Sequence, residues 1–374
     1  MVRAGAGRIV LGMTLGAVLL SGCARFDDRA SSPFTTEPTW QDAEPKTTTP
    51  KTPPSNAKRP DLPCVDPDLA VVVSCLDTTG GLVALPDGGS ALVTERTTGR
   101  ILKVVATDEG EPPAPVEVAR LDVDPSGDGG VTGLALSPTF DEDGLFYAYV
   151  TTPSDNRVVR VSTDGGAPKP ILTGIPKGAN GNRGSISFLH GRMLVLTGDA
   201  GNPVLAGDTS SLAGKLLGIT APAPGAAPEV MASGIGVAGG VCADGKDSIW
   251  FTDRTATEDR LQRIGADGVA VKAWTWSDHP GVAGCAAATD AVAISMTNQK
   301  ALAIAAADKN THAVTATPAL LAQDKYGRLD GAAIGGDGNI WAGTVNKPDG
   351  NPNQYDDRVV RIPPPSGSGN GGPD

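Results

Sequence analysis

The sequence has 374 residues, a formal net charge of −11 and an aromatic content of only 4%. An acidic chain with few aromatic side chains lacks the basic surface and the stacking platforms of nucleic-acid-binding proteins, which excludes nucleic acid as a partner. The 49 Gly and 31 Pro residues indicate many short strands joined by turns rather than long helices.

The N-terminal segment is typical of an exported lipoprotein. Arg3 and Arg8 precede an apolar run over residues 9–20, which is too short to span a bilayer as a helix. The run ends in Leu20-Ser21-Gly22-Cys23, which resembles the lipobox at which a bacterial signal peptide is cut before a cysteine that carries diacylglycerol. We therefore expect a signal peptide over residues 1–22 and a lipidated Cys23 that anchors the protein on the extracytoplasmic face of the cell membrane. The alternative is an ordinary signal peptide followed by a chance cysteine.

Low-complexity segments flank the central part of the chain. Residues 23–61 are rich in Thr, Pro, Lys and acidic residues and offer few apolar side chains for burial, so we expect a semi-extended, disordered tether. Residues 364–374 are rich in Gly, Ser and Pro and are expected to be disordered. The folded domain is therefore predicted over residues 62–363.

One pattern recurs six times in this domain. A Gly-containing apolar run, a turn and two further apolar runs begin near residue 81, and again near residues 130, 184, 240, 284 and 331. The spacing of roughly 45–55 residues is the period of a four-stranded propeller blade. We therefore predict an all-β fold, a six-bladed β-propeller of four-stranded antiparallel blades. The alternative is an unclosed pair of β-sandwiches.

Four cysteines lie within the predicted domain. Export to an oxidising compartment lets disulfides persist, and the pairing nearest by position joins Cys64 with Cys75 and Cys242 with Cys285. No Cys-x-x-Cys pair is present, so a zinc cluster is not expected. We interpret the cysteines as forming structural disulfides rather than a redox pair, and their connectivity is left open.

Three segments of the chain resemble a known family. They are residues 127–140 (GDGGVTGLALSPTF), residues 197–203 with 211–215 (TGDAGNP and SLAGK), and Tyr326-Gly327-Arg328-Leu329. They are similar to the soluble glucose and sorbosone dehydrogenases, which are six-bladed propellers that use pyrroloquinoline quinone (PQQ) and calcium. The resemblance covers most of residues 82–362 and implies the same fold.

The residues that the family uses for chemistry are only partly matched. The family's catalytic His should lie within residues 179–186, which read ANGNRGSI and contain no His. Its Gly-x-Arg-Asn segment corresponds to residues 234–237 (GIGV), and the Gly-Pro pair that binds calcium should fall near residues 254–256 (RTA). Its Arg-x-Arg clamp for the cofactor becomes Arg328-Leu329-Asp330. The resemblance therefore leaves Arg328 as the cofactor-binding candidate, and we expect Asp330 to lie on the same strand face and to pair with it.

Few other side chains are candidates for a site. Asp128 matches a position that faces substrate in the family, although an Asp between Gly residues is more often a turn former. Asp199 is expected to cap backbone amides. His190, His279 and His312 lack a second ligand at metal-binding spacing, so no metal site is predicted, and we assign no catalytic residue.

Two hypotheses follow from this sequence. The first is a lipid-anchored propeller that binds a ligand or partner and needs neither PQQ nor calcium. The second is an active PQQ-dependent sugar dehydrogenase of the glucose/sorbosone type that also binds calcium. The departures at residues 179–186 and at Asp330 favour the first. The expected partners are the membrane, through the lipid anchor, and a sugar or another envelope component.

Overall fold

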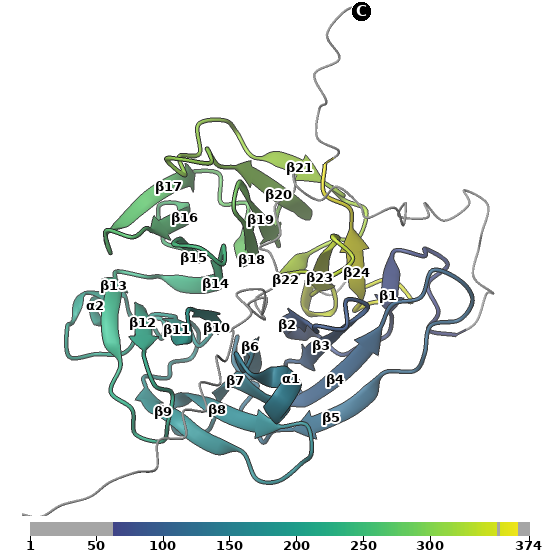
Figure 1. Cartoon of the computed structure of the whole chain (residues 1–374), viewed down its shortest axis with the longest axis horizontal. Coiled ribbons are helices and arrows are strands. Elements are labelled where there is room, and N and C mark those ends of the chain that lie inside the picture. Colours follow the sequence, from purple (N-terminus) through teal and green to yellow (C-terminus); the bar gives the residue numbers. More distant parts are fainter. Residues whose placement is uncertain (1–62, 350–351, 366–374) are drawn as a thin grey trace, which may run out of the picture. The chain divides into compact units, whose positions relative to one another are not determined.

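A computed structural model of the protein describes residues 63–349 and 352–365, and within them it contains six four-stranded antiparallel sheets. The sheets are arranged as blades around a central axis (Figure 1). The predicted six-bladed β-propeller is therefore confirmed. The predicted signal peptide, Cys23 and the tether lie outside the described residues, as do residues 366–374 of the predicted tail.

Blades 1 to 5 each follow the order of the chain from the axis outwards. Blade 1 consists of β2 (Thr79–Ala84), β3 (Ser90–Glu95), β4 (Arg100–Val105) and β5 (Val116–Arg120). Blade 2 consists of β6 (Val131–Leu136), β7 (Leu145–Thr151), β8 (Asn156–Ser162) and β9 (Lys169–Ile175). Blade 3 consists of β10 (Gly184–Leu189), β11 (Arg192–Thr197), β12 (Lys215–Ile219) and β13 (Glu229–Ser233). Blade 4 consists of β14 (Val237–Ala243), β15 (Ile249–Arg254), β16 (Asp259–Ile264) and β17 (Ala270–Trp276). Blade 5 consists of β18 (Val282–Ala288), β19 (Ala291–Met296), β20 (Ala301–Ala306) and β21 (Ala319–Leu321).

Blade 6 joins the two ends of the described chain. It consists of β22 (Leu329–Ile334), β23 (Ile340–Thr344), β24 (Val359–Ile362) and, as its outer strand, β1 (Val71–Val73). In the antiparallel pair between β1 and β24, Val71 lies opposite Val360. Because the first strand of the chain completes the last blade, the ring is closed by hydrogen bonds and presents no break between blades 6 and 1.

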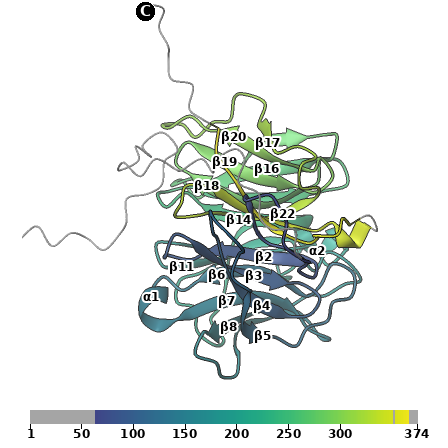
Figure 2. The ribbon, with the colours of Figure 1, turned by 90° about the vertical axis from the view of Figure 1, so that its right-hand side faces the viewer.

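Short helical segments lie in the connections between strands. They are α1 (Phe140–Asp143) between β6 and β7, α2 (Pro203–Gly207) between β11 and β12, and the 3-10 helix η1 (Lys347–Asp349). Figure 2 shows that α1 and α2 lie at opposite faces of the propeller. No helix in the described part of the chain has the length and apolar character that a membrane crossing requires.

The apolar side chains form six separate cores, one between each pair of neighbouring blades. Trp250 lies in the core between blades 4 and 5, and Trp341 lies in the core between blades 6 and 1; both are fully buried. The second strand of each blade is buried along most of its length, whereas the outer strands β5 and β13 are largely exposed. A blade therefore buries its apolar faces only against its neighbours, which is why the pattern must recur and close.

Glycines let the inner strands approach one another closely around the axis. A Cβ atom at Gly240 would lie 2.8 Å from the Cα atom of Gly284, and one at Gly284 would lie 2.5 Å from the carbonyl oxygen of Asp330. These contacts are with backbone atoms, which cannot swing aside as a side chain would. The recurrent Gly at the start of each repeat therefore reflects blade packing.

Both disulfides that the spacing suggested are present. Cys64, which lies before β1, is bonded to Cys75, which lies after it, and Cys242 of β14 is bonded to Cys285 of β18. The second bond joins the inner strands of two neighbouring blades, so it adds a covalent link across a blade interface.

Candidate ligand-binding site

Arginine side chains gather on the face of the propeller where the inner strands begin. Arg183 directly precedes inner strand β10, Arg96 directly follows β3, and Arg254 is the last residue of β15. Because the first two strands of a blade are antiparallel, the second strand ends on the face where the inner strand begins. We call this the arginine face; α2 lies on it, and α1 lies on the opposite face (Figure 2).

Blades 1 and 4 place Arg96 and Arg254 at equivalent positions. Each arginine follows a Thr and an acidic residue, in Thr94-Glu95-Arg96 and Thr252-Asp253-Arg254. The acidic residue binds an arginine of the next strand: Glu95 lies 2.9 Å from Arg100, and Asp253 contacts Arg260. Because side chains alternate along a strand, Arg254 at the end of β15 is directed away from that ion pair.

An ion pair spans the axis on this face. The Nη2 atom of Arg183 lies 2.5 Å from both carboxylate oxygens of Asp330. Arg183 belongs to blade 3 and Asp330 to β22 of blade 6, and these two blades lie opposite each other in the ring. The Asp330 side chain is 2% exposed and that of Arg183 is 15% exposed, so the pair is largely removed from water.

The predicted pairing of Asp330 with Arg328 is wrong. Asp330 binds Arg183 instead. Strand alternation does not apply to Arg328, because β22 begins at Leu329 and the backbone N–H of Arg328 donates to Oδ1 of Asn346 at 2.8 Å. Arg328 also does not line the central cavity of the described propeller. Its proposed contact with a cofactor remains a prediction.

The three arginines share one electrostatic environment. Burial tends to lower the pKa of Arg183, but the charge of Asp330 and the hydrogen bonds to it outweigh burial and raise that pKa. Burial lowers the pKa of Arg96, and the positive charge of Arg183 lowers it further. The same two causes lower the pKa of Arg254. All three stay protonated near neutral pH, so the site carries crowded positive charge.

Arg96 has a hydrogen-bond partner within the described residues, whereas one donor of Arg254 has none there. The Nη1 atom of Arg96 donates to the carbonyl oxygen of Gly129. The Nε atom of Arg254 is buried and has no hydrogen-bond partner among the described residues. An unpaired buried donor is costly in a folded protein, which makes Arg254 a candidate for contact with a ligand.

Asp128 positions the segment that carries Arg183. Its carboxylate accepts hydrogen bonds from the backbone N–H groups of Gly181 and Asn182, both at 3.0 Å. Asp128 belongs to the loop before β6 and the accepted amides belong to the loop before β10, so this contact links blades 2 and 3. Direct contact between Asp128 and a ligand remains a prediction.

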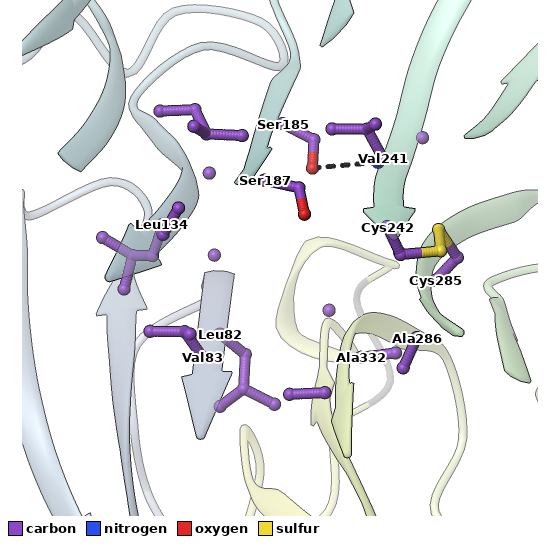
Figure 3. A pocket seen from close by; sticks show the side chains of 18 of the residues that line it. Leu82, Val83, Leu134, Ser185, Ser187, Val241, Cys242, Cys285, Ala286 and Ala332 are labelled. Carbon is purple, nitrogen blue, oxygen red and sulfur yellow. Dashed lines mark hydrogen bonds between the residues drawn. A yellow bond between two sulfur atoms is a disulfide. The ribbon is translucent and has the colours of Figure 1, made fainter. Parts of the chain in front are cut away.

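A cavity of about 330 Å³ occupies the axis next to the ion pair. Arg183 and Asp330 line it near the starts of the inner strands, and residues as far as Leu136, Phe188 and Ile334 line it near the strand ends. The cavity therefore runs from the ion pair toward the face opposite the arginine face. Figure 3 shows its walls, including the disulfide between Cys242 and Cys285.

The three histidines do not line this cavity. His190 contacts the carbonyl oxygen of Lys246 at 2.5 Å, and Nδ1 of His279 lies 3.1 Å from Oδ1 of Asp259. His312 follows β20, in the loop that leads to β21. Sequence reasoning missed Arg96, Arg183 and Arg254 as site residues, although the repeated Thr-acid-Arg motif was a signal that could have identified Arg96 and Arg254.

The chain matches a family model described as Glucose / Sorbosone dehydrogenase over residues 76–238. The PQQ-bound aldose sugar dehydrogenase from Streptomyces coelicolor is 30% identical to it, with a TM-score of 0.70, and the match covers 78% of this chain and 96% of that enzyme. The chain belongs to the glucose/sorbosone dehydrogenase family. A comparison with curated proteins found no match.

Two further solved structures show the same propeller. A putative oxidoreductase (glucose dehydrogenase) from Thermus thermophilus is 27% identical, with a TM-score of 0.66, and the match covers 78% of this chain and 98% of that one. The apo form of the soluble aldose sugar dehydrogenase from Escherichia coli is 19% identical, with a TM-score of 0.62 and coverage of 79% and 98%. The second likeness concerns the fold alone.

Gly181 lies in the segment where the resemblance implies the family's catalytic His, and it has no room for a side chain. A Cβ atom at Gly181 would lie 2.4 Å from the backbone nitrogen of Gly201 and 2.6 Å from Oδ1 of Asp199, and Gly181 has a φ of +72°. A histidine at 181 would therefore be both clashing and strained, so it cannot serve there as a base.

The segment that replaces the glucose/sorbosone dehydrogenase Gly-x-Arg-Asn motif is packed rather than open. Ile235 is fully buried, and a Cβ atom at Gly236 would lie 2.1 Å from the carbonyl oxygen of Arg254. Among the described residues, no three His, Cys, Asp or Glu side chains are grouped so that they could hold a metal ion.

Proposed function

We propose that the protein is a ligand-binding propeller that has lost sugar dehydrogenase chemistry. The observation that supports this most strongly is the ion pair between Arg183 and Asp330. Asp330 stands where the family resemblance implies the second arginine of a clamp for a cofactor with carboxylates. A largely buried carboxylate at that point repels another carboxylate and also engages the nearest guanidinium.

The ligand that this face fits is a small anionic sugar derivative from the cell envelope. Arg254 offers a buried donor that has no partner in the described part of the chain, and Arg96 and Arg183 add positive charge beside it. Guanidinium groups bind carboxylates through charge-assisted hydrogen bonds. A sugar is the substrate class in the names of the solved relatives, and the arginines favour an acidic one.

Calorimetric titration with glucuronate, using glucose as the neutral control, tests this ligand class. We expect glucuronate to bind and Arg254→Met to weaken that binding about tenfold, which corresponds to the loss of one charge-assisted hydrogen bond. Arg192→Met is the matched control, because Arg192 forms a separate ion pair with Glu229. Equal affinity for glucose and glucuronate would contradict the proposal.

The second candidate is an active PQQ-dependent sugar dehydrogenase, which the 30% identity to the PQQ-bound Streptomyces enzyme favours. The calcium-loaded protein can be titrated with PQQ while absorbance is followed, and dye reduction is then measured with aldose sugars. We expect neither saturable PQQ binding nor sugar-dependent dye reduction. Robust turnover would establish the second candidate and reject the first.

We also propose that acyl chains on Cys23 hold the propeller on the extracytoplasmic face of the cell membrane. The lipobox-like Leu20-Ser21-Gly22-Cys23 supports this localisation, since two or more acyl chains anchor a protein stably. We expect the unmodified protein in the membrane fraction and Cys23→Ser in the soluble fraction or the medium. Release of the unmodified protein as an unacylated species would refute the anchor.

A further inference from the structure

We propose that the disulfide between Cys64 and Cys75 is a redox switch: a dithiol reduces it in the folded protein, and its reduction loosens the segment that closes the ring. We call residues 64–78 the closing segment, because they contain β1 and lead into β2. The switch acts with or without a bound ligand, so it is independent of the proposed function.

The two disulfides of the described domain differ in their accessibility to thiols in solution. Cys64 is exposed and Cys75 is partly buried. Cys242 and Cys285 are only 7% and 6% exposed and lie in the core between blades 4 and 5. Thiol–disulfide exchange requires a thiolate to reach a sulfur atom, so exposed disulfides exchange while buried ones do not. A dithiol in solution therefore reaches Cys64 but not the bond between the two blades.

Both cysteines of the switch have a backbone conformation that the bond helps to maintain. The angle φ is +61° at Cys64 and +56° at Cys75. This is the left-handed region that favours glycine, and another residue stays there only while its surroundings hold it. Reduction removes the covalent link between the two residues and lets both relax. Opening the bond therefore changes the backbone as well as the sulfur atoms.

The disulfide fastens a closure strand that is very short. The strand β1 has three residues and pairs with β24, the third strand of blade 6 (Figure 1). After β1, the backbone N–H of Cys75 donates to the carbonyl oxygen of Tyr355 at 2.8 Å, and Leu76 and Asp357 exchange backbone hydrogen bonds of 2.9 and 3.1 Å. A strand of this length makes few ladder bonds, so its attachment depends on such contacts and on the covalent link.

The residues directly after the disulfide bind the turn that carries Arg96. The backbone N–H of Asp77 donates to Oε1 of Glu95 at 3.0 Å, and the hydroxyl of Thr97 donates to Oδ2 of Asp77 at 3.0 Å. The backbone N–H of Arg96 donates to the carbonyl oxygen of Thr78 at 2.7 Å. Loosening of the closing segment therefore reaches one of the three arginines of the arginine face.

A dithiol supplies the two electrons and the two protons of the reduction. One of its sulfurs, as a thiolate, attacks Sγ of Cys64, and the bond between the cysteines breaks with Sγ of Cys75 as the leaving group. The second sulfur of the dithiol then attacks the mixed disulfide, so the dithiol leaves as a cyclic disulfide and both cysteines end as thiols. Sγ of Cys75 lies 3.5 Å from the carbonyl oxygen of Gln354, so the new thiol can donate to it.

Alkylation followed by mass spectrometry tests whether the switch opens in the folded protein. The full chain carrying Cys23→Ser keeps only the four cysteines of the two disulfides. It is incubated with dithiothreitol under native conditions and quenched with iodoacetamide. We expect Cys64 and Cys75 to be alkylated about tenfold faster than Cys242 and Cys285, because only the first bond is accessible. Equal rates, or no reduction of either bond while the protein is folded, would overturn the proposal.

Hydrogen exchange, also followed by mass spectrometry, tests what the reduction does. Once the switch is reduced, we expect exchange about fivefold faster at the backbone N–H groups of Leu76, Arg96 and Asp357, whose hydrogen bonds hold the closing segment. Exchange in β11 of blade 3 should stay the same. Unchanged exchange at the three groups after complete reduction would overturn the proposal. Global unfolding would do so too, because the bond would then be required for the fold itself.

Two paired variants assign the effect to the switch. Cys64→Ala with Cys75→Ala should show the faster exchange without any reductant, and dithiothreitol should add nothing to it. Cys242→Ala with Cys285→Ala is the matched control and should keep slow exchange in the closing segment until dithiothreitol is added. Tryptophan fluorescence confirms that each variant is folded. A response to dithiothreitol in the folded first variant would assign the effect to another group and overturn the proposal.

Discussion

Replacing Arg183 with Met should destabilise the propeller because it leaves Asp330 without its counter-charge. The Asp330 side chain is 2% exposed, and Arg183 binds both of its carboxylate oxygens at 2.5 Å. Removing one partner of a buried ion pair costs about 3–5 kcal/mol, since the remaining charge is buried without compensation. In a protein of this size that corresponds to a fall of roughly 6–10 °C in the melting temperature.

A second variant separates the loss of a charge from the loss of packing. In Arg183→Met with Asp330→Leu neither charge of the pair remains, so we expect most of the stability to return. Urea unfolding followed by tryptophan fluorescence gives the free energy of unfolding for the wild type, the single variant and the double variant. The m-value should be the same for all three, because the fold is unchanged.

Two results would refute this reasoning. A loss below about 1 kcal/mol in Arg183→Met would mean that the pair behaves as a solvated surface ion pair and does not close the axis. A double variant no more stable than the single variant would mean that packing of the arginine stem, rather than its charge, accounts for the loss.

Three further predictions concern the ring and its closure. Replacing Cys242 and Cys285 with Ala opens a loop with a sequence separation of 43 and should lower the free energy of unfolding by about 3–4 kcal/mol, measured by denaturant titration; no change would show that the bond does not constrain the unfolded chain. Gly284→Ala would bring a Cβ atom within 2.5 Å of backbone on the next inner strand and should cost about 1–3 kcal/mol or more, whereas Gly89→Ala, with nothing within 4 Å, is the matched control that should not. Burial raises the pKa of Asp357 to about 6, above the unfolded value near 3.9, so its proton stabilises the native state at pH 5 by about 1 kcal/mol and this contribution is lost as the pH rises through 6. Melting curves of Asp357→Asn should lack that contribution to the pH dependence between pH 5 and 7, and an unchanged dependence would assign it to another group.

Local pattern in the sequence was enough to predict the blades. The six Gly-containing runs correspond to β2, β6, β10, β14, β18 and β22, and the apolar runs after them correspond to the second and third strands. These strands can be predicted from short stretches of sequence, because successive side chains in a strand point to opposite faces and burial therefore alternates with a period of two residues. The disulfide pairing nearest by position was also right, since Cys242 and Cys285 occupy equivalent positions in adjacent blades.

The residues that form the outer strands, and the way in which the ring closes, could be identified only from the tertiary structure. Outer strands such as β5, which reads VEVAR, are mostly exposed and give no strong apolar signal. The outer strand of blade 6 comes from residues 71–73, which lie far in sequence from β24. No local sequence pattern therefore predicts that these two strands pair. The free energy that selects this pairing comes from burying the faces of blades 6 and 1 together.

The candidate site was decided by the same closure. Asp330 was expected to pair with Arg328, two residues away, but its partner is Arg183, at a sequence separation of 147. Sequence identifies which residues are charged and on which end of a strand they lie. Which guanidinium meets which carboxylate depends on the six inner strands being drawn together around one axis, because only that geometry places the starts of β10 and β22 across from each other.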